Sequence, residues 1–149
     1  MGNLTHEVLY QAFFYHSLCM CVCARVCMCV CCPVNSSLTV PVDTKAVLSC
    51  PPVPLTNAIV TTWEIMLTDK PSCIRAYGRE KNETTEVNCT DERITWPYRP
   101  DQNAALQIDP VVPPHDGFYR CEVVTPDGNF YHGYHLQVLG KEHTLWCFR

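Results

Sequence analysis

Two cysteines, a tryptophan and a tyrosine constrain the fold of this 149-residue chain more than any other feature. Trp63 follows Cys50 after a short interval, Cys121 comes much later, and Tyr119 stands two positions before Cys121. Each of the four falls on one alternating face of a segment rich in β-branched and aromatic residues, which is the pattern of a half-buried strand. The four side chains are therefore expected in one core, between strands that lie far apart in the sequence.

Short strands account for most of this region. Prolines and the turn Asp127-Gly128-Asn129 separate the apolar runs, and no window keeps a helical period. Alternation predicts strands over residues 46–50, 59–67, 105–108, 118–125 and 131–139. Many short strands bounded by turns indicate an antiparallel sandwich or barrel.

The order Cys, Trp, Tyr-x-Cys resembles the pattern of immunoglobulin domains. This resemblance implies a disulfide between Cys50 and Cys121 that joins two sheets, with Trp63 packed against it. The long interval between the two cysteines has room for additional strands, which favours the variable type. We expect an all-β, immunoglobulin-like β-sandwich of variable type with an inter-sheet disulfide. Its core should include Trp63, Tyr119, Leu106 and Ile108.

His115 departs from the variable-domain pattern. In many such domains an aspartate two residues before the glycine pairs with an arginine at the start of an earlier strand. Here the aspartate comes one position later, at Asp116, so a pair between Arg93 and Asp116 stays open.

Cys73 and Cys89 flank a polar segment with the character of a hairpin. A second disulfide between them would close a loop of about 17 residues and stabilise the domain by about 3 kcal/mol. It would also stiffen an exposed ribbon at the edge of the sheet. Cys147 has no evident partner, so a dimer linked through Cys147 is a further expectation.

The cysteines and charges divide the chain into three parts. Residues 1–33 form an apolar leader with seven of the twelve cysteines, residues 34–139 the immunoglobulin variable-type domain, and residues 140–149 a short divergent tail. The leader has the length of a signal-peptide apolar region but carries no basic residue before it. Its alternating Cys and Val are also what a translated TG repeat or a wrongly assigned exon would give. A thiolate metal cluster is the third interpretation.

Composition narrows the function classes. The net charge of −4 and the pI of about 5.8 give no basic surface for nucleic acid. No phosphate-binding, dinucleotide or hydrolase motif occurs, so we expect no enzyme activity and no cofactor. His132 and His135 point to opposite faces of a strand, which argues against a metal site. Sequons at Asn3, Asn35, Asn82 and Asn88 predict glycosylation, and Asn35, Asn82 and Asn88 lie in the domain.

Several strings are similar to the first domain of the OX-2 membrane glycoprotein receptor family. The resemblance covers residues 46–139, and the strings lie at 62–65, 71–73, 88–96, 99–103, 106–108, 115–117 and 124–139. It implies a myeloid-cell receptor, inhibitory or activating, that binds the variable domain of the OX-2 membrane glycoprotein. Family members continue into a second domain, a membrane span and a cytoplasmic tail, so a chain that ends at Arg149 is expected to be a truncated isoform, a fragment or a secreted decoy. An adhesion or structural module that self-associates is the alternative.

The resemblance also implies where a ligand would bind. In the family, the ligand contacts one sheet of the sandwich and the loops at its end. In this chain that sheet includes the strands expected over residues 59–67, 118–125 and 131–139. Along each of these strands, every second side chain points away from the core. The loop before the last strand contributes Phe130 as a candidate contact residue. The expected ligand face is Thr62, Glu64, Met66, Arg120, Glu122, Val124, Phe130, Tyr131, His135 and Gln137.

Overall fold

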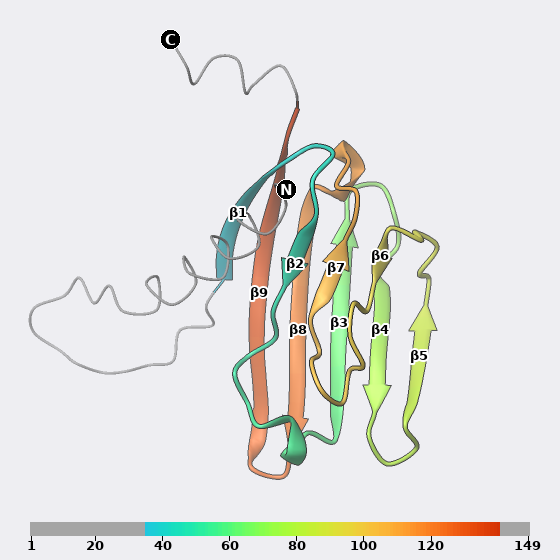
Figure 1. Cartoon of the computed structure of the whole chain (residues 1–149), viewed down its shortest axis with the longest axis vertical. Coiled ribbons are helices and arrows are strands. Elements are labelled where there is room, and N and C mark those ends of the chain that lie inside the picture. The colour runs from blue at the N-terminus through green and yellow to red at the C-terminus, as the bar shows by residue number, and fades with distance from the viewer. Residues whose placement is uncertain (1–34, 141–149) are drawn as a thin grey trace, which may run out of the picture. The chain divides into compact units, whose positions relative to one another are not determined.

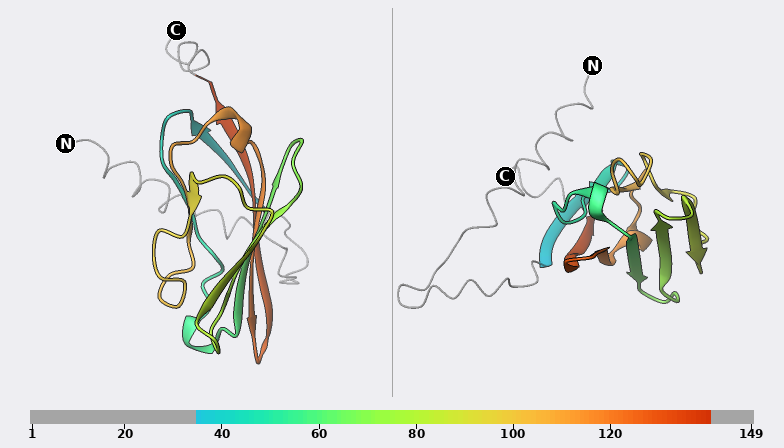
Figure 2. Two further views of the ribbon diagram at one scale, coloured as in Figure 1. Left: turned by 90° about the vertical axis from the view of Figure 1, so that its right-hand side faces the viewer. Right: turned by 90° about the horizontal axis from the view of Figure 1, so that it is seen from below.

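The computed structural model describes residues 35–140, which form two stacked β-sheets (Figure 1). The larger sheet has the order β1-β9-β8-β3-β4-β5, and the smaller has the order β2-β7-β6. The strands of the larger sheet are β1 (Asn35–Pro41), β3 (Val60–Leu67), β4 (Cys73–Gly78), β5 (Glu83–Val87), β8 (Gly117–Thr125) and β9 (Gly128–Leu139). Those of the smaller sheet are β2 (Ala46–Leu48), β6 (Ile94–Thr95) and β7 (Leu106–Ile108). The turned views in Figure 2 separate the two layers.

Two short 3-10 turns complete the described part of the chain. They are η2 (Leu55–Asn57) and η3 (Pro113–His115), and η3 leads directly into β8. The leader, Asn3, and the tail with Cys147 lie outside the described residues, so the expectations made for them stay predictions.

The variable-type sandwich expected from the sequence is confirmed. The pair β4 and β5 extends the larger sheet beyond β3, as the interval between the conserved cysteines indicates. β1 pairs in parallel with β9 over its whole length, from Asn35 opposite Gly133 to Pro41 opposite Leu139. The sequence did not predict β1, because its first three residues are polar and only Val40 is fully buried.

The inter-sheet disulfide between Cys50 and Cys121 is confirmed, with a Cα–Cα distance of 5.4 Å. Trp63 is the register partner of Cys121 on the neighbouring strand and has no exposed surface. Its indole Nε1–H donates to the carbonyl of Ala104 at 2.8 Å, so the buried polar atom is satisfied. The ring of Tyr134 stacks on Trp63 with centroids 6.2 Å apart. Tyr119, Leu106 and Ile108 are also fully buried.

β2 ends at Leu48, two residues earlier than alternation predicts. Continuing the ladder would require Ala104 and Ala105 to bond to the chain around Cys50. Side chains already occupy those groups, because Trp63 bonds to the Ala104 carbonyl and Asn103 Oδ1 accepts the Ala105 N–H at 3.1 Å. Local side-chain bonds therefore stop the pairing.

The start of β8 requires a glycine. A Cβ on Gly117 would lie 2.5 Å from the carbonyl oxygen of Met66 on the adjacent strand. Two residues later, the Tyr119 hydroxyl donates to the His115 carbonyl at 2.7 Å, which ties the strand to the turn before it and forms the tyrosine corner.

Replacing both Cys50 and Cys121 with alanine should lower the free energy of unfolding by about 4 kcal/mol, because the unfolded chain loses the cross-link over a separation of 71 residues. Guanidinium denaturation of the oxidised chain measures this change. The matched variant Cys73→Ala with Cys89→Ala removes a cross-link over a separation of only 16 residues and should lose about 3 kcal/mol. A loss below about 1 kcal/mol for the first pair would contradict a central role for this disulfide.

Candidate functional site

The face of the larger sheet that points away from the smaller sheet is called here the outer face. Every second residue of β3 and β8 is buried between the sheets, and the residues between them point to the outer face. Arg120, Tyr131 and Gln137 are exposed there, whereas Thr62, Glu64, Met66, Glu122, Val124 and His135 are half-buried. Register places these residues in rows across the neighbouring strands β3, β8 and β9.

One row is aromatic. Phe118 lies opposite Met66 on one side and His135 on the other. The rings of Phe118 and His135 stack with centroids 4.5 Å apart and an angle of 12° between their planes. Phe118 is 55% exposed, a large apolar surface for a side chain with packed neighbours. Sequence reasoning did not name Phe118, although its alternation with Arg120 was a sufficient signal.

The next row is centred on Arg120. Its Nη2 lies 3.2 Å from Glu64 Oε2, and its guanidinium carbon lies 5.4 Å from the centroid of the Tyr131 ring. The guanidinium therefore contacts both a carboxylate and an aromatic ring on the surface. An ordered arginine beside an exposed aromatic is a frequent centre of a protein interface.

This second row continues toward the edge of the sheet. Ile74 lies opposite Glu64, and Val87 lies opposite Ile74. Both apolar side chains are exposed, at 38% and 55%. The outer face therefore combines one central charge pair with apolar surface on both sides of it.

Phe130 is placed differently from the expectation. It lies within β9 rather than in the preceding loop, and its register partner is Val123. Since Val123 is fully buried between the sheets and cross-strand partners share a face, Phe130 lies on the inner side of the sheet at the end of the hairpin. Nearby, Asn129 donates its Nδ2–H to Glu122 Oε1 at 3.1 Å.

The open question of the Arg93–Asp116 pair is resolved against it. Arg93 makes a two-pronged contact with Asp91, at 2.8 and 3.0 Å. His115 is fully buried, and its Nε2 lies 2.9 Å from the second oxygen of Asp91. Asp116 instead accepts the backbone N–H of Val138 at 3.2 Å.

Hydrogen bonding fixes the tautomer of His115. The backbone N–H of Val112 donates to Nδ1 at 3.0 Å, so the ring proton lies on Nε2 and is donated to Asp91. Burial lowers the pKa of His115, and the Asp91 carboxylate only partly opposes that effect. Hydrogen bonds from Arg93 hold the pKa of Asp91 well below its ordinary value.

The sequons of the described region lie at exposed or terminal positions. Asn35 begins β1, Asn82 lies in the turn between β4 and β5, and Asn88 follows β5. Asn82 and Asn88 have positive φ angles of 52° and 55°, which is typical of asparagine in tight turns. The Asn82 Oδ1 accepts a hydrogen bond from the Tyr77 hydroxyl at 2.7 Å.

The two histidines of β9 have separate surroundings. His132 lies 3.2 Å from the Ser36 hydroxyl and packs on Tyr134, whereas His135 stacks on Phe118. Within residues 35–140, no group of three or more potential ligands could hold a metal ion. That same segment contains no helix long and apolar enough to cross a membrane.

Residues 34–139 match the family described as "Immunoglobulin V-set domain", and the chain belongs to that family. The sandwich, its inter-sheet disulfide and its two additional strands define the same class.

Within this class the chain is similar to cell surface glycoprotein CD200 receptors. It is 66% identical over 96 residues to human CD200 receptor 1 and 64% identical over 98 residues to the bovine protein. These matches cover 64% and 66% of the chain but only 28% of each receptor. The extracellular portion of mouse CD200RLa superposes with a TM-score of 0.66 at 43% identity, over 72% of this chain and 57% of that one. CD200 is the OX-2 glycoprotein, so the resemblance inferred from the sequence is confirmed.

The burial of His115 predicts a pH dependence of stability. The pKa of folded His115 lies below its unfolded value of about 6.5, so unfolding takes up a proton as the pH falls through this window. Burial lowers the pKa of His132 as well, and it adds to the effect. Between pH 7 and 5 the free energy of unfolding should fall by up to about 1.4 kcal/mol per pH unit for each of the two groups.

Denaturation of the full chain at pH 5, 6 and 7 measures this slope. His115→Gln and His132→Gln should each remove one titrating group, so that unfolding takes up fewer protons and the slope becomes smaller. The double variant should have a smaller slope than either single variant. A slope that His115→Gln leaves unchanged would show that the buried imidazole does not titrate in this range.

Proposed function

We propose that this chain carries the ligand-binding domain of an immune receptor of the CD200 receptor type, and that its outer face binds the immunoglobulin-like ligand CD200. The single observation that carries the proposal is the identity of 64–66% with the bovine and human receptors across this domain. The role is recognition rather than catalysis. Its setting would be the extracellular side of a membrane or the extracellular fluid, where the two disulfides are stable.

The composition of the outer face supports this assignment. Phe118 and Tyr131 expose aromatic surface on either side of Arg120, and all three side chains have packed or charged neighbours that limit their motion. Binding then costs little side-chain entropy, which favours such groups as anchors of an interface. A binding domain of this kind would restrain or activate myeloid cells through the rest of a full-length receptor.

Self-association is the second candidate. β5 pairs with β4 on one side only, and all of its residues are exposed. A free edge strand can pair with a second copy. However, Glu83 and Glu86 place charge on this strand and the sequons at Asn82 and Asn88 flank it, which disfavours pairing of edges.

Arg120→Glu should weaken binding to immobilised CD200 by about 10-fold or more, because it removes the cation and repels Glu64. Phe118→Ala should weaken it to a similar degree, and Phe130→Ala tests whether the end of the hairpin contributes. Surface plasmon resonance measures all three affinities.

The matched control is Lys45→Glu, which makes the same charge change at an exposed position beside β2 in the smaller sheet. It should change the affinity less than about 2-fold. Equal loss in Lys45→Glu and Arg120→Glu would refute the outer face as the binding site. No binding by the unmodified chain, together with concentration-dependent dimers, would favour self-association.

Glycosylation at Asn35, Asn82 and Asn88 is expected in a secretory host. Enzymatic removal of N-glycans should lower the mass of the chain, and each Asn→Gln variant should remove one glycan. An unchanged mass in all three variants would contradict the assignment. The expectation of a truncated isoform or soluble decoy stays a prediction, and transcripts read across the leader and the tail test it.

A further inference from the structure

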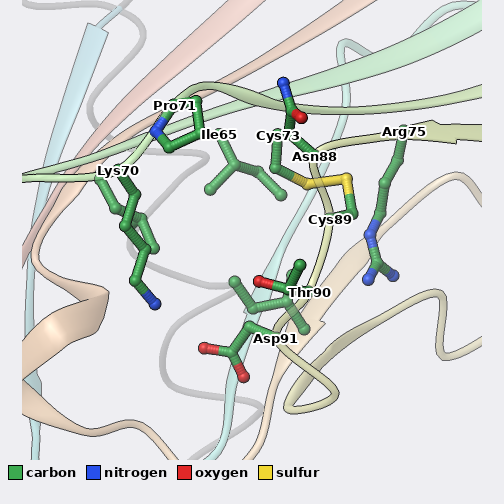
Figure 3. Close-up of a pocket in the computed structure, with 11 residues that line it drawn as sticks. Ile65, Lys70, Pro71, Cys73, Arg75, Asn88, Cys89, Thr90 and Asp91 are labelled. Atoms are coloured by element: carbon green, nitrogen blue, oxygen red, sulfur yellow. A yellow bond between two sulfur atoms is a disulfide. The ribbon is translucent and has the colours of Figure 1, made fainter.

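A pocket of about 340 Å³ opens at the edge of the sandwich, where the chain passes from the larger sheet to the smaller one (Figure 3). Its lining comes from the inward side of β3 and β4, from β6, and from the segment that joins β5 to β6. The volume lies in the range of small-molecule sites. The pocket is on the opposite side of the larger sheet from the outer face, so its occupation would use none of the residues proposed to bind CD200.

The inner wall of the pocket is apolar. Ile65 and Ile94, which come from different sheets, are both buried and form its floor. Leu67 and Pro71 extend the apolar wall, and the disulfide between Cys73 and Cys89 closes one side. The disulfide also holds the end of β5 against the start of β4, so this wall is covalently braced.

A buried arginine lines this apolar space. The side chain of Arg75 is only 8% exposed, and it lies beside the disulfide between Cys73 and Cys89 (Figure 3). One terminal nitrogen, Nη1, lies 3.5 Å from Glu86, which is a long contact for an ion pair. The buried Nε–H has no hydrogen-bond partner. A buried charged donor without an acceptor is costly, so a ligand that supplies an acceptor there gains free energy.

Apart from the long contact with Glu86, the charged groups around the pocket do not pair with Arg75. Lys70 stands at the rim and adds a second positive charge. Asp91 also lines the pocket, but both of its oxygens already accept hydrogen bonds from Arg93 and His115. Asp91 is therefore not free to satisfy Arg75.

We propose that this pocket binds a small carboxylate with an apolar body, such as an aryl-alkanoic acid. The carboxylate accepts from the Nε–H of Arg75 and from the adjacent edge of the guanidinium, which matches the two oxygens of a carboxylate. The apolar body packs against Ile65 and Ile94. Asn88 lies at the rim with its amide turned away from the interior, so a glycan at this position leaves the pocket open (Figure 3).

A comparison of charged and neutral probes tests the proposal on the full oxidised chain. 3-Phenylpropanoate should bind with about millimolar affinity or better and should shift the backbone NMR signals of residues that line the pocket. The neutral 3-phenylpropanamide, which has the same size and shape, should bind at least about 10-fold more weakly. Equal affinity of the two probes, preferential binding of the amine 3-phenylpropylamine, or shifts elsewhere on the domain would overturn the proposal.

Variants locate the interaction. Arg75→Gln should weaken 3-phenylpropanoate binding by about 10-fold or more. Glu86→Gln should tighten it by a few fold, because Arg75 keeps its charge and loses its competing partner. Glu86 is 45% exposed, so this second variant is informative even if Arg75→Gln fails to fold. Lys81→Gln, an exposed position in the β4–β5 turn, is the control for general charge and should change nothing. Weaker binding in Glu86→Gln, or an equal loss in Lys81→Gln, would overturn the proposal.

Discussion

The contact between the inter-sheet disulfide and Trp63 is the constraint on which the rest of the domain depends. The disulfide fixes the distance between the two sheets, and the indole occupies the space beside it while bonding to Ala104 in the chain that leads into the smaller sheet. With both sheets held in this way, the inward residues of β3 and β8 are fixed as core. The same alternation then determines which side chains reach the outer face.

The sequence predicted the core well because its signal is chemical as well as periodic. A cysteine, a tryptophan and a tyrosine at the right intervals have few alternative explanations, and the strands around them alternate strongly. β1 and β6 were not predicted because their sequences carry little strand signal. β1 starts with polar residues, and β6 has only two residues. Their positions are determined by the neighbouring strands rather than by their own sequences.

For the candidate ligand face, the sequence predicted which way most side chains point but not which side chains contact one another. Alternation separated outward from inward residues on β3, β8 and β9, yet it could not show that Phe118 stacks on His135 or that Phe130 belongs to the inner side. The sequence also could not predict that Asp91 pairs with both Arg93 and His115, because Asp91 lies far from His115 in sequence. A buried histidine that donates to Asp91 takes the place of the expected arginine–aspartate pair, and its burial is the basis for the predicted loss of stability in mild acid.

The parallel pairing of β1 with β9 has a mechanical consequence. Because both strands run in the same direction, tension applied at Asn35 and at Leu139 would pull them past one another along their length. All rungs of the ladder would carry the load together instead of opening one after another from an end. Such a shear arrangement resists stretching better than a peeling one, so the larger sheet would keep its strand order under tension applied at these two ends.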